Sequence, residues 1–370
     1  GTYPLGNSNN PLKVPNASLG AMPAVDRTWE TIETYNAGID FATLNNRLSG
    51  TFDYFIKDNK NMFYAEEFPT ILGTSAPSIN GAHVRTNGWE LTLNWKDKIG
   101  KVGYRIGLNL SDNKTKVISL SDSRNPGHGL MGFVEGYPTN SFFIYEFDGF
   151  IKDEADLADY KTKMKGGVPT NLRVGDAKYV DKDGDGVLEP TLYKEGDPNS
   201  GDIVYKGTNN QRYLYGINLG LDWKGIDVSA FLQGVGKWDC INGTYAGGGE
   251  VWKQSSQYFY HNTWSPDRPN AEYPRLTQDG GIHGYNYQWS DAPYKFFNNR
   301  YLRLKEVQIG YTFPTTLTKK IGVEKLRVYA TGMNLLEWDN LPNGFDPEAP
   351  YTENLIPFSR TYSIGVNVQF

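Results

Sequence analysis

The sequence predicts an all-β protein, a transmembrane antiparallel β-barrel, and three observations support this. Residues 361–370 alternate small or polar side chains with apolar ones and end on Phe370. Since a strand points successive side chains to opposite faces, one face of this segment is apolar and the other polar. About nine segments share this alternation, with aromatic residues near their ends, which suits lipid outside and water inside. Their connections alternate between very short and very long, as the turns and loops of outer-membrane barrels do.

The composition fits a chain in which aromatic residues replace aliphatic ones. Of 370 residues only 38% are hydrophobic, yet 14% are aromatic, with 25 Tyr and 9 Trp. No run approaches the ~18 apolar residues of a membrane-spanning helix, so a role in the membrane would depend on strands. The net charge of -5 and the pI near 5.5 disfavour nucleic acid as a partner, because that role needs clustered Lys and Arg. The single cysteine, Cys240, excludes an internal disulfide.

The first two predicted strand pairs each close on a short turn. Strands at about 30–43 and 47–64 are joined by Leu44-Asn45-Asn46, and Asn tolerates the positive φ of tight hairpin turns. Strands at about 84–95 and 102–114 are joined by residues 96–100. Apolar side chains at every second position are expected to face lipid: Tyr35, Ala37, Ile39, Phe41, Leu48, Phe52, Tyr54, Ile56, Trp89, Leu91, Leu93, Trp95, Tyr104, Ile106, Leu108 and Leu110. The residues between them are mostly polar or Gly and are expected to line the lumen.

The remaining predicted strands follow the same rule. The third pair covers about 212–223 and 226–235 and turns at Lys224-Gly225. The fourth covers about 300–313 and 325–335, and its connection predicts one helical turn closed by Gly322. A last strand runs from about 359 to 370. Two excursions, at about 117–211 and 236–298, are expected to be extracellular, the first with a short helix near 153–165.

The strand count leads to an expectation about the whole barrel. Short turns of such barrels lie on the periplasmic side, so the C-terminus is expected in the periplasm. Closed bacterial barrels normally have an even number of strands, whereas about nine are predicted here. The N-terminal stretch begins Gly1-Thr2-Tyr3-Pro4, continues rich in Pro, Asn, Gly and Ser, and shows neither the basic nor the apolar region of a signal peptide. This is expected either of a processed chain or of the C-terminal piece of a longer one. We therefore expect residues 1–370 to be the C-terminal part of a larger barrel, with the earlier strands and the plug domain absent from this chain.

Several short motifs, each only a strand or turn by itself, together resemble one known family. They are Tyr35-Asn36-Ala37-Gly38-Ile39-Asp40-Phe41, Leu48-Ser49-Gly50-Thr51-Phe52-Asp53-Tyr54, Asn87-Gly88-Trp89-Glu90-Leu91, Gly175-Asp176-Ala177-Lys178-Tyr179, Asp183-Gly184-Asp185-Gly186, Gly216-Ile217-Asn218-Leu219, Phe231-Leu232-Gln233-Gly234 and Arg360-Thr361-Tyr362-Ser363-Ile364-Gly365. Over essentially its whole length the chain resembles the SusC/RagA-like TonB-dependent transporters. The resemblance implies a barrel of about 22 strands in the outer membrane of a Gram-negative bacterium. It also implies import of oligosaccharides or oligopeptides, energised through the TonB complex, with a plug domain and a SusD-like surface lipoprotein as partners.

An Asp-rich segment of the first excursion is the candidate metal site. Asp181, Asp183 and Asp185 occupy positions 1, 3 and 5 of a Gly-containing loop, and Glu189 follows. Carboxylates at this spacing converge on Ca2+ in an EF-hand loop. Leu192 stands where that loop places a bidentate acid, so the full signature fails. The alternative is a surface turn whose Asp side chains accept hydrogen bonds from their own backbone. The predicted function requires no cofactor.

The second excursion is rich in aromatic residues and is the candidate ligand-binding segment. Flat rings with polar edges stack on sugar faces or peptide backbones, and nearby Asn and Asp offer hydrogen bonds. The predicted ligand-contact residues are Trp238, Trp252, Tyr258, Tyr260, Trp264, Tyr287 and Trp289. The alternative for any single ring is that it packs the long segment against itself. A surface lipoprotein would compete for the same face.

Catalysis finds little support in the sequence. The four histidines are scattered over predicted loops, with no His-x-x-x-His spacing, and no carboxylate pair for glycoside hydrolysis can be nominated. We therefore name no catalytic residue and expect no enzyme. The alternative to a transporter is a self-standing surface protein of the adhesin or lectin kind that binds glycans or peptides. A self-standing protein of this kind would remain monomeric and folded in water without detergent. A membrane barrel would not, because its apolar lipid-facing band would associate in water.

Overall fold

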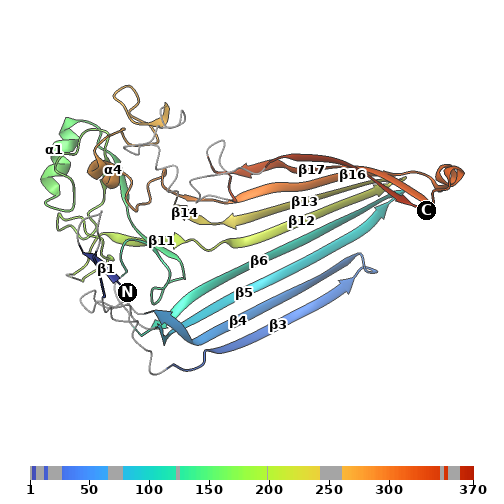
Figure 1. The fold of residues 1–370 in the computed structure, drawn as a ribbon, viewed down its shortest axis with the longest axis horizontal. Coiled ribbons are helices and arrows are strands. Elements are labelled where there is room, and N and C mark those ends of the chain that lie inside the picture. Colours follow the sequence, from blue (N-terminus) through green and yellow to red (C-terminus); the bar gives the residue numbers. More distant parts are fainter. Residues whose placement is uncertain are drawn as a thin grey trace.

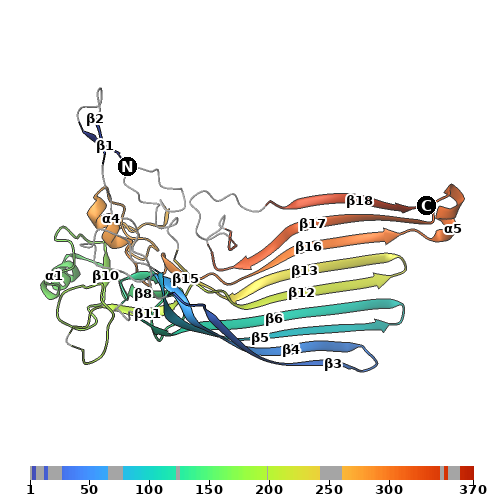
Figure 2. The ribbon, with the colours of Figure 1, turned by 60° about the horizontal axis from the view of Figure 1, so that its bottom comes forward.

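One antiparallel sheet of nine strands dominates the computed structural model (Figures 1 and 2). The structure describes residues 2–5, 12–15, 27–65, 78–121, 126–197, 199–241, 261–341, 346–348 and 359–370. The strand order is β18-β17-β16-β13-β12-β6-β5-β4-β3, so each strand of this sheet lies beside the next one along the chain. The bounds are β3 Thr31–Thr43, β4 Leu48–Ala65, β5 Ser78–Ile99, β6 Val102–Leu120, β12 Arg212–Trp223, β13 Ile226–Lys237, β16 Tyr301–Thr312, β17 Lys325–Asp339 and β18 Thr361–Gln369. The predicted all-β antiparallel architecture is confirmed.

The short turns lie together at one end of the sheet, and most have the predicted chemistry (Figure 1). Leu44, Asn45 and Asn46 take φ values of 55°, 57° and 59°. Lys224 and Gly225 take 46° and 88°, which is the left-handed pair that a two-residue hairpin turn requires. The β16–β17 connection contains α5 (Thr315–Thr318) and the short 3-10 helix η3 (Lys319–Ile321), which ends at Gly322 with φ 75°. This is the predicted helical turn closed by Gly322.

The predicted turn at residues 96–100 is wrong. β5 continues to Ile99 and β6 begins at Val102, so only Gly100, at φ 61°, and Lys101 form the turn. Residues 96–99 belong to the strand because all four remain paired with β6, from Lys96 opposite Arg105 to Ile99 opposite Val102. At the other end β5 starts at Ser78 and β6 ends at Leu120, beyond the predicted 84 and 114.

One face of the sheet is apolar across all nine strands. The register pairs Leu93 with Leu108 and Leu108 with Ile217, and the rows in the middle of the sheet place predicted lipid-facing residues side by side. These side chains are open to the surroundings: Ile39 is 61% exposed and Ile364 83%. Aromatic residues flank the band, with Tyr54, Trp89, Tyr213 and Tyr215 towards the long connections and Trp95, Tyr104, Trp223 and Tyr311 towards the short turns. An exposed apolar band between two aromatic girdles is the lipid-facing surface of a membrane barrel.

The opposite face is polar. One row across it consists of Ser49, Asn94, Gly107 and Asn218. Several glycines of this face lie under a long charged side chain of the next strand: a Cβ on Gly220 would collide with the guanidinium of Arg105. Charged side chains such as that of Arg105 therefore lie along the inner face of the sheet, over the glycines of the neighbouring strand.

The long connections fold into a cap at the end of the sheet opposite the short turns (Figures 1 and 2). Its elements are β7 Gly129–Met131, β8 Ser141–Tyr145, β9 Phe147–Phe150, α1 Glu154–Lys163, β10 Ala177–Tyr179, β11 Ile203–Thr208, β14 Asp239–Ile241, α4 Gly280–Asn286 and β15 Phe296–Asn298. β8 lies between β7 and β11, while β9 pairs with β10 and β14 with β15. A separate hairpin near the start joins β1 (Thr2–Leu5) to β2 (Leu12–Pro15). Helix α1 falls within the predicted helix, and Asp153 caps it by accepting from the Asp156 amide.

The two excursions share one hydrophobic core. Its buried residues come mainly from the first excursion, including Phe143, Ile151 and Tyr179, and Ile282 and Tyr285 from the second pack among them. The hydroxyls of Tyr160 and Tyr285 lie 2.9 Å apart within this core. The amide side chain of Asn286 accepts from the Ala177 amide and donates to the Asp176 carboxylate, both at 2.9 Å. The excursions are therefore one folded unit rather than two independent loops. Among the described residues, no helix has the length and apolar character needed to cross a membrane.

Candidate functional site

An aromatic cleft lies where the cap meets the rim of the sheet. It encloses about 520 Å³ and is lined by Phe147, Phe150, Asn270, Ala271, Glu272, Tyr273, Pro293, Tyr294, Phe297, Asn340 and Leu341. The lining residues come from four segments: strand β9, the stretch 270–273, the stretch 293–297 that enters β15, and the end of β17. A cleft of this size, with apolar walls and a few polar groups, is typical of a site for a small ligand.

The rings of the cleft are fixed by packing against one another. Phe150 stacks on Tyr294 with 5.9 Å between ring centroids, and Phe147 meets the edge of Tyr294 at 5.6 Å. The Tyr294 hydroxyl donates to the Asn286 carbonyl oxygen at 2.6 Å, and burial raises the pKa of that hydroxyl. The Asp291 carboxylate accepts from the Phe147 amide at 2.6 Å, which anchors β9 beside the second excursion. The aromatic wall is preorganised, so a ligand would lose little free energy in ordering it.

Polar groups lie on the open side of the cleft. Asn270, Glu272 and Asn340 are exposed there, and Asn340 also donates to the Asn298 carbonyl oxygen at 3.2 Å. No Lys or Arg is among the described residues that line the cleft. Rings below and amide or carboxylate groups above suit a neutral ligand that offers flat apolar faces and hydrogen-bonding edges, such as a sugar ring or a peptide segment.

A buried ionic cluster fixes the wall beside the cleft. Arg303 of β16 is only 1% exposed and contacts three carboxylates: Glu337 at 2.7 Å, Asp346 at 2.8 Å and Glu348 at 2.9 Å. Lys305 also binds Glu348 at 2.9 Å. In addition, the Asn299 side chain donates to the carbonyl oxygen of residue 347 at 2.7 Å. Residues 346–348 are thereby held against β16, close to the end of β15 that lines the cleft.

Four of the seven predicted ligand-contact residues fall within the described residues, and none of the four lines this cleft. Trp238 and Tyr287 are each 8% exposed and belong to hydrophobic cores. Trp264 covers Gly175, whose φ of 90° and lack of a Cβ permit the ring to lie against the backbone. Trp289 lies over Gly129 in the same way. In this structure the four rings pack the cap, as the alternative interpretation held, and their contact with a ligand stays a prediction.

The other three predicted contacts, Trp252, Tyr258 and Tyr260, lie outside the described residues. The rings that do line the cleft include Tyr273 and Tyr294 of the aromatic second excursion, as well as Phe147 and Phe150 of the first excursion. One feature of the sequence could have indicated Phe147 and Phe150, namely the aromatic-rich segment that begins at Phe142. Which of its members would be exposed could not be deduced from spacing.

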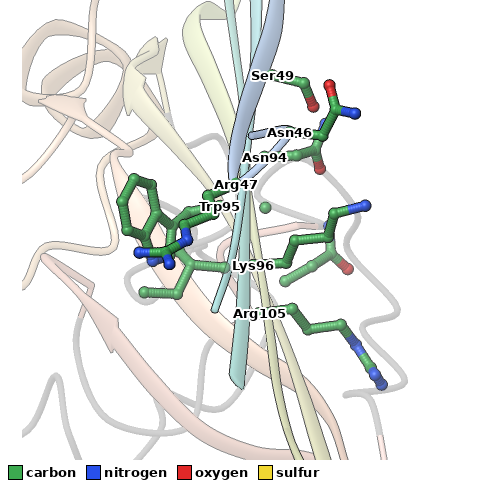
Figure 3. Close-up of a pocket in the computed structure, with 10 residues that line it drawn as sticks. Asn46, Arg47, Ser49, Asn94, Trp95, Lys96 and Arg105 are labelled. Carbon is green, nitrogen blue, oxygen red and sulfur yellow. The ribbon is translucent and has the colours of Figure 1, made fainter. Parts of the chain in front are cut away.

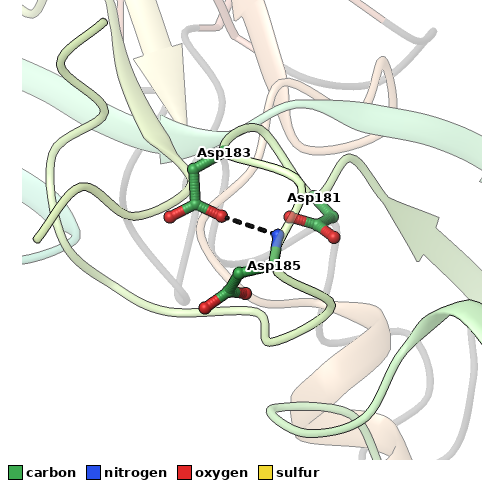
Figure 4. Close-up of side chains that lie close together, drawn as sticks. All are labelled: Asp181, Asp183 and Asp185. Carbon is green, nitrogen blue, oxygen red and sulfur yellow. Dashed lines mark hydrogen bonds between the residues drawn. The ribbon is translucent and has the colours of Figure 1, made fainter. Parts of the chain in front are cut away.

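The predicted metal loop brings its three aspartates together. The ligand atoms of Asp181, Asp183 and Asp185 lie within 4.8 Å of one another (Figure 4). The same carboxylates accept backbone hydrogen bonds: Asp181 from Gly184 and Gly186 at 2.8 Å, and Asp183 from Asp185 at 3.2 Å. Glu189 is not part of this group among the described residues. Both interpretations, a cation loop and a self-bonded turn, are compatible with this geometry.

A fourth carboxylate stabilises the backbone of this loop from below. Asp202 is fully buried and accepts from the amides of Lys182 at 2.5 Å and Glu189 at 2.7 Å. Burial raises the pKa of Asp202, and the negative charges of Asp183 and Asp181 raise it further. A bound cation would offset this accumulation of negative charge.

We predict that Ca2+ stabilises the folded protein through this loop. A ligand that binds only the folded state stabilises it by RT ln(1 + [L]/Kd), so millimolar Ca2+ is expected to raise the melting temperature by about 2–4 °C over EDTA. Asp183→Asn should abolish the difference, whereas Asp159→Asn, an exposed acid on α1 paired with Lys163, should keep it. Superimposable melting curves in Ca2+ and EDTA would identify the loop as a plain Asp-rich turn.

A second hollow, of about 270 Å³, lies at the short-turn end of the sheet (Figure 3). Asn46, Ser49, Asn94, Lys96 and Arg105 point to one side of the strands there, while Arg47 and Trp95 point to the other. This split agrees with the register, which puts Trp95 on the apolar face. The hollow is lined by residues of both faces, including Trp95 and Ile106, and lacks the converging rings of the cleft.

Comparison with known proteins defines the class to which this fold belongs. Residues 2–186 match the family model described as TonB dependent receptor-like, beta-barrel. The chain belongs to this family of β-barrel receptors of the Gram-negative outer membrane.

The similar proteins give a finer position within the class. The chain is 27% identical to TonB-dependent receptor P3 of Formosa agariphila, over 92% of this chain and 34% of that protein. It is 24% identical to TonB-dependent receptor SusC of Bacteroides thetaiotaomicron, over 92% of this chain and 32% of that protein. It superposes on a structure of the RagAB peptide transporter with a TM-score of 0.71 and 21% identity, over 100% of this chain and 38% of that one. The predicted resemblance to SusC/RagA-like transporters is confirmed, and the chain spans about a third of the length of the curated relatives it matches.

Proposed function

We propose that this chain forms part of the wall and cap of an active transporter that imports oligosaccharides or oligopeptides across the outer membrane. The observation that supports the proposal most directly is the aromatic cleft, which is lined by residues of the cap and by residues just past the end of β17. A ligand held there would lie between the cap and the end of the sheet. The sheet supplies the lipid-facing wall, and the cap supplies the first contact with the substrate.

The proposed substrate class follows from the chemistry of the cleft. Five rings and three polar side chains line it, and no cationic side chain of the described residues faces a ligand there. Polyanionic substrates are therefore disfavoured, whereas neutral glycans and peptides both fit. The similarity to the RagAB peptide transporter supports the peptide class.

The orientation and partners are part of the same proposal. We place the cap and both excursions outside the cell and the short turns with the C-terminus in the periplasm, because outer-membrane barrels have short periplasmic turns. The TonB complex would supply the energy, through a plug domain, and a SusD-like surface lipoprotein would cover the cap. The TonB complex is inferred from the family to which the chain belongs, and the lipoprotein from the similarity to SusC and to the RagAB transporter.

Truncating two rings of the cleft is expected to weaken ligand binding. Phe150→Ala with Phe297→Ala removes one ring from each of two walls, and about 1 kcal/mol for each stacking contact predicts a roughly 30-fold weaker affinity. Binding would be measured by titrating pools of oligosaccharides and of oligopeptides into the full-length protein in detergent. Phe63→Ala on β4, whose ring is 42% exposed and does not line the cleft, is the matched control. Equal affinity of the double variant and the control for every retained ligand would contradict the proposed site.

A further inference from the structure

Two lysines lie on the outer face of the sheet, directly above the aromatic girdle on the long-connection side. Lys114 of β6 pairs with Asn87, and Lys116 pairs with Arg85. Along β6 they continue the every-second-residue series of Leu108 and Leu110, and the pairing is regular from Val102 to Val117, so both side chains lie on the lipid-facing side. Both are exposed.

Their height matches the headgroup layer of a bilayer. Trp89 of the girdle is opposite Asp112 on β6. Lys114 and Lys116 follow by two and four residues, which is about 7 and 13 Å along the strand at a rise of roughly 3.3 Å per residue. For a strand tilted by about 40°, this corresponds to roughly 5 and 10 Å above the girdle, where lipid headgroups begin.

Other charged groups at this level are neutralised by partners on the protein. Arg85 binds Asp58 through two hydrogen bonds of 2.8 and 3.0 Å. Lys60 binds Glu33 at 2.7 Å, and the guanidinium of Arg212 binds Asp112. Lys114 and Lys116 form no ion pair within the part of the chain that the structure describes. The result is a patch with two uncompensated positive charges beside the apolar band.

We propose that Lys114 and Lys116 bind the phosphate of a glycolipid in the outer leaflet, with the acyl chains lying on the apolar band below. Two ammonium groups two residues apart on one face of β6 can contact one or two phosphate groups, and the amide of Asn87, opposite Lys114, offers a hydrogen bond to the sugar. Each basic side chain near an anionic membrane surface increases the affinity for the lipid, so two lysines together should produce a measurable effect on binding. The inference rests on the proposed orientation, in which the long connections lie outside.

The test compares Lys114→Gln/Lys116→Gln with Lys319→Gln/Lys320→Gln, a pair of exposed neighbouring lysines at the opposite, short-turn end of the sheet. Native mass spectrometry of the full-length protein in detergent would count bound molecules of a glycolipid whose diglucosamine headgroup carries two phosphates. The first variant is expected to bind this lipid roughly 30-fold more weakly than the second. Lys114→Arg/Lys116→Arg should restore binding, which separates lost charge from lost folding.

Three results would overturn the inference. One is equal binding of the glycolipid by the two glutamine variants. Another is equal binding of the same glycolipid after its phosphates are removed. The third is saturation of the patch by inorganic phosphate alone, which would identify a site for the free anion. Because ligand titration of the cleft is a separate measurement, failure of the lipid site leaves the proposed transport function standing, and the reverse also holds.

Discussion

Replacing Arg303 with methionine is expected to destabilise the protein by about 3–5 kcal/mol, because removing one member of a buried ionic cluster leaves the others uncompensated. Asp346 is 5% exposed and would lose its ion pair with Arg303, while Glu348 would keep its ion pair with Lys305. Residues 346–348 would then no longer be fixed beside the cleft. Urea unfolding of the full-length protein in detergent, followed by tryptophan fluorescence, measures the effect.

The matched control is Arg47→Met. Arg47 forms an ion pair of 3.2 Å with Asp97, but its side chain is 54% exposed, so its loss should cost about 1 kcal/mol or less. A similar small loss for both variants would show that burial adds nothing to the Arg303 cluster. Partial recovery by Arg303→Lys is expected, since an ammonium restores the charge but cannot reach three carboxylates in the geometry of a guanidinium.

Placing an arginine in the apolar band at Leu108 is expected to cost about 2–4 kcal/mol, because the charge would lie near the bilayer midplane. Leu108 lies midway along β6 between Tyr104 and Asp112, which is opposite the girdle residue Trp89. Folding into lipid vesicles, followed by the shift of the folded barrel on unheated gels, measures the loss.

Its neighbour supplies a control on the same strand at the same depth. Asn109→Arg adds the same charge on the polar inner face, where Thr92 and Gly216 are its partners in the ladder. We expect a change of less than about 1 kcal/mol there, since the charge stays in water. If both variants folded equally well in vesicles, the assignment of the apolar face to lipid would be wrong.

Most of the sheet could be predicted from the sequence because its signals are local. Alternation at a period of two fixes which face a residue occupies, and a register slip would move every apolar side chain to the wrong side. The Asn-rich turn at residues 44–46 and the Lys224-Gly225 turn determine where neighbouring strands meet. The predicted turn at residues 96–100 was wrong because charged residues are typical of loops. In the structure Asp97 forms an ion pair with Arg47, and the ladder continues to Ile99.

The candidate site could not be predicted in the same way, because it is assembled from distant segments. Phe147 and Tyr294 touch across almost 150 residues of sequence, and spacing carries no information on such a contact. The predicted tryptophans were chosen for their chemistry, but burial decided their role: Trp238 donates to Asn209 inside a core. Arg303 gave no signal, since a charged residue on an alternating strand is normally expected in water.

The shared core of the cap has a consequence for how the sheet assembles. Four hairpins of the sheet close through short turns or a short helical connection, but β6 joins β12 only across about 90 residues and β13 joins β16 across about 60. Each doubling of such a loop adds about 0.6 kcal/mol to the entropic cost of closing it. The β6–β12 and β13–β16 pairings, here called the two seams, are therefore expected to form more slowly than the hairpins. Because Tyr160 and Tyr285 belong to different excursions yet meet in one core, folding of the cap brings the ends of both seams together at once. We therefore expect the hairpins to form first, the cap second and the continuous sheet last, with the folded cap holding the strands of the wall in position.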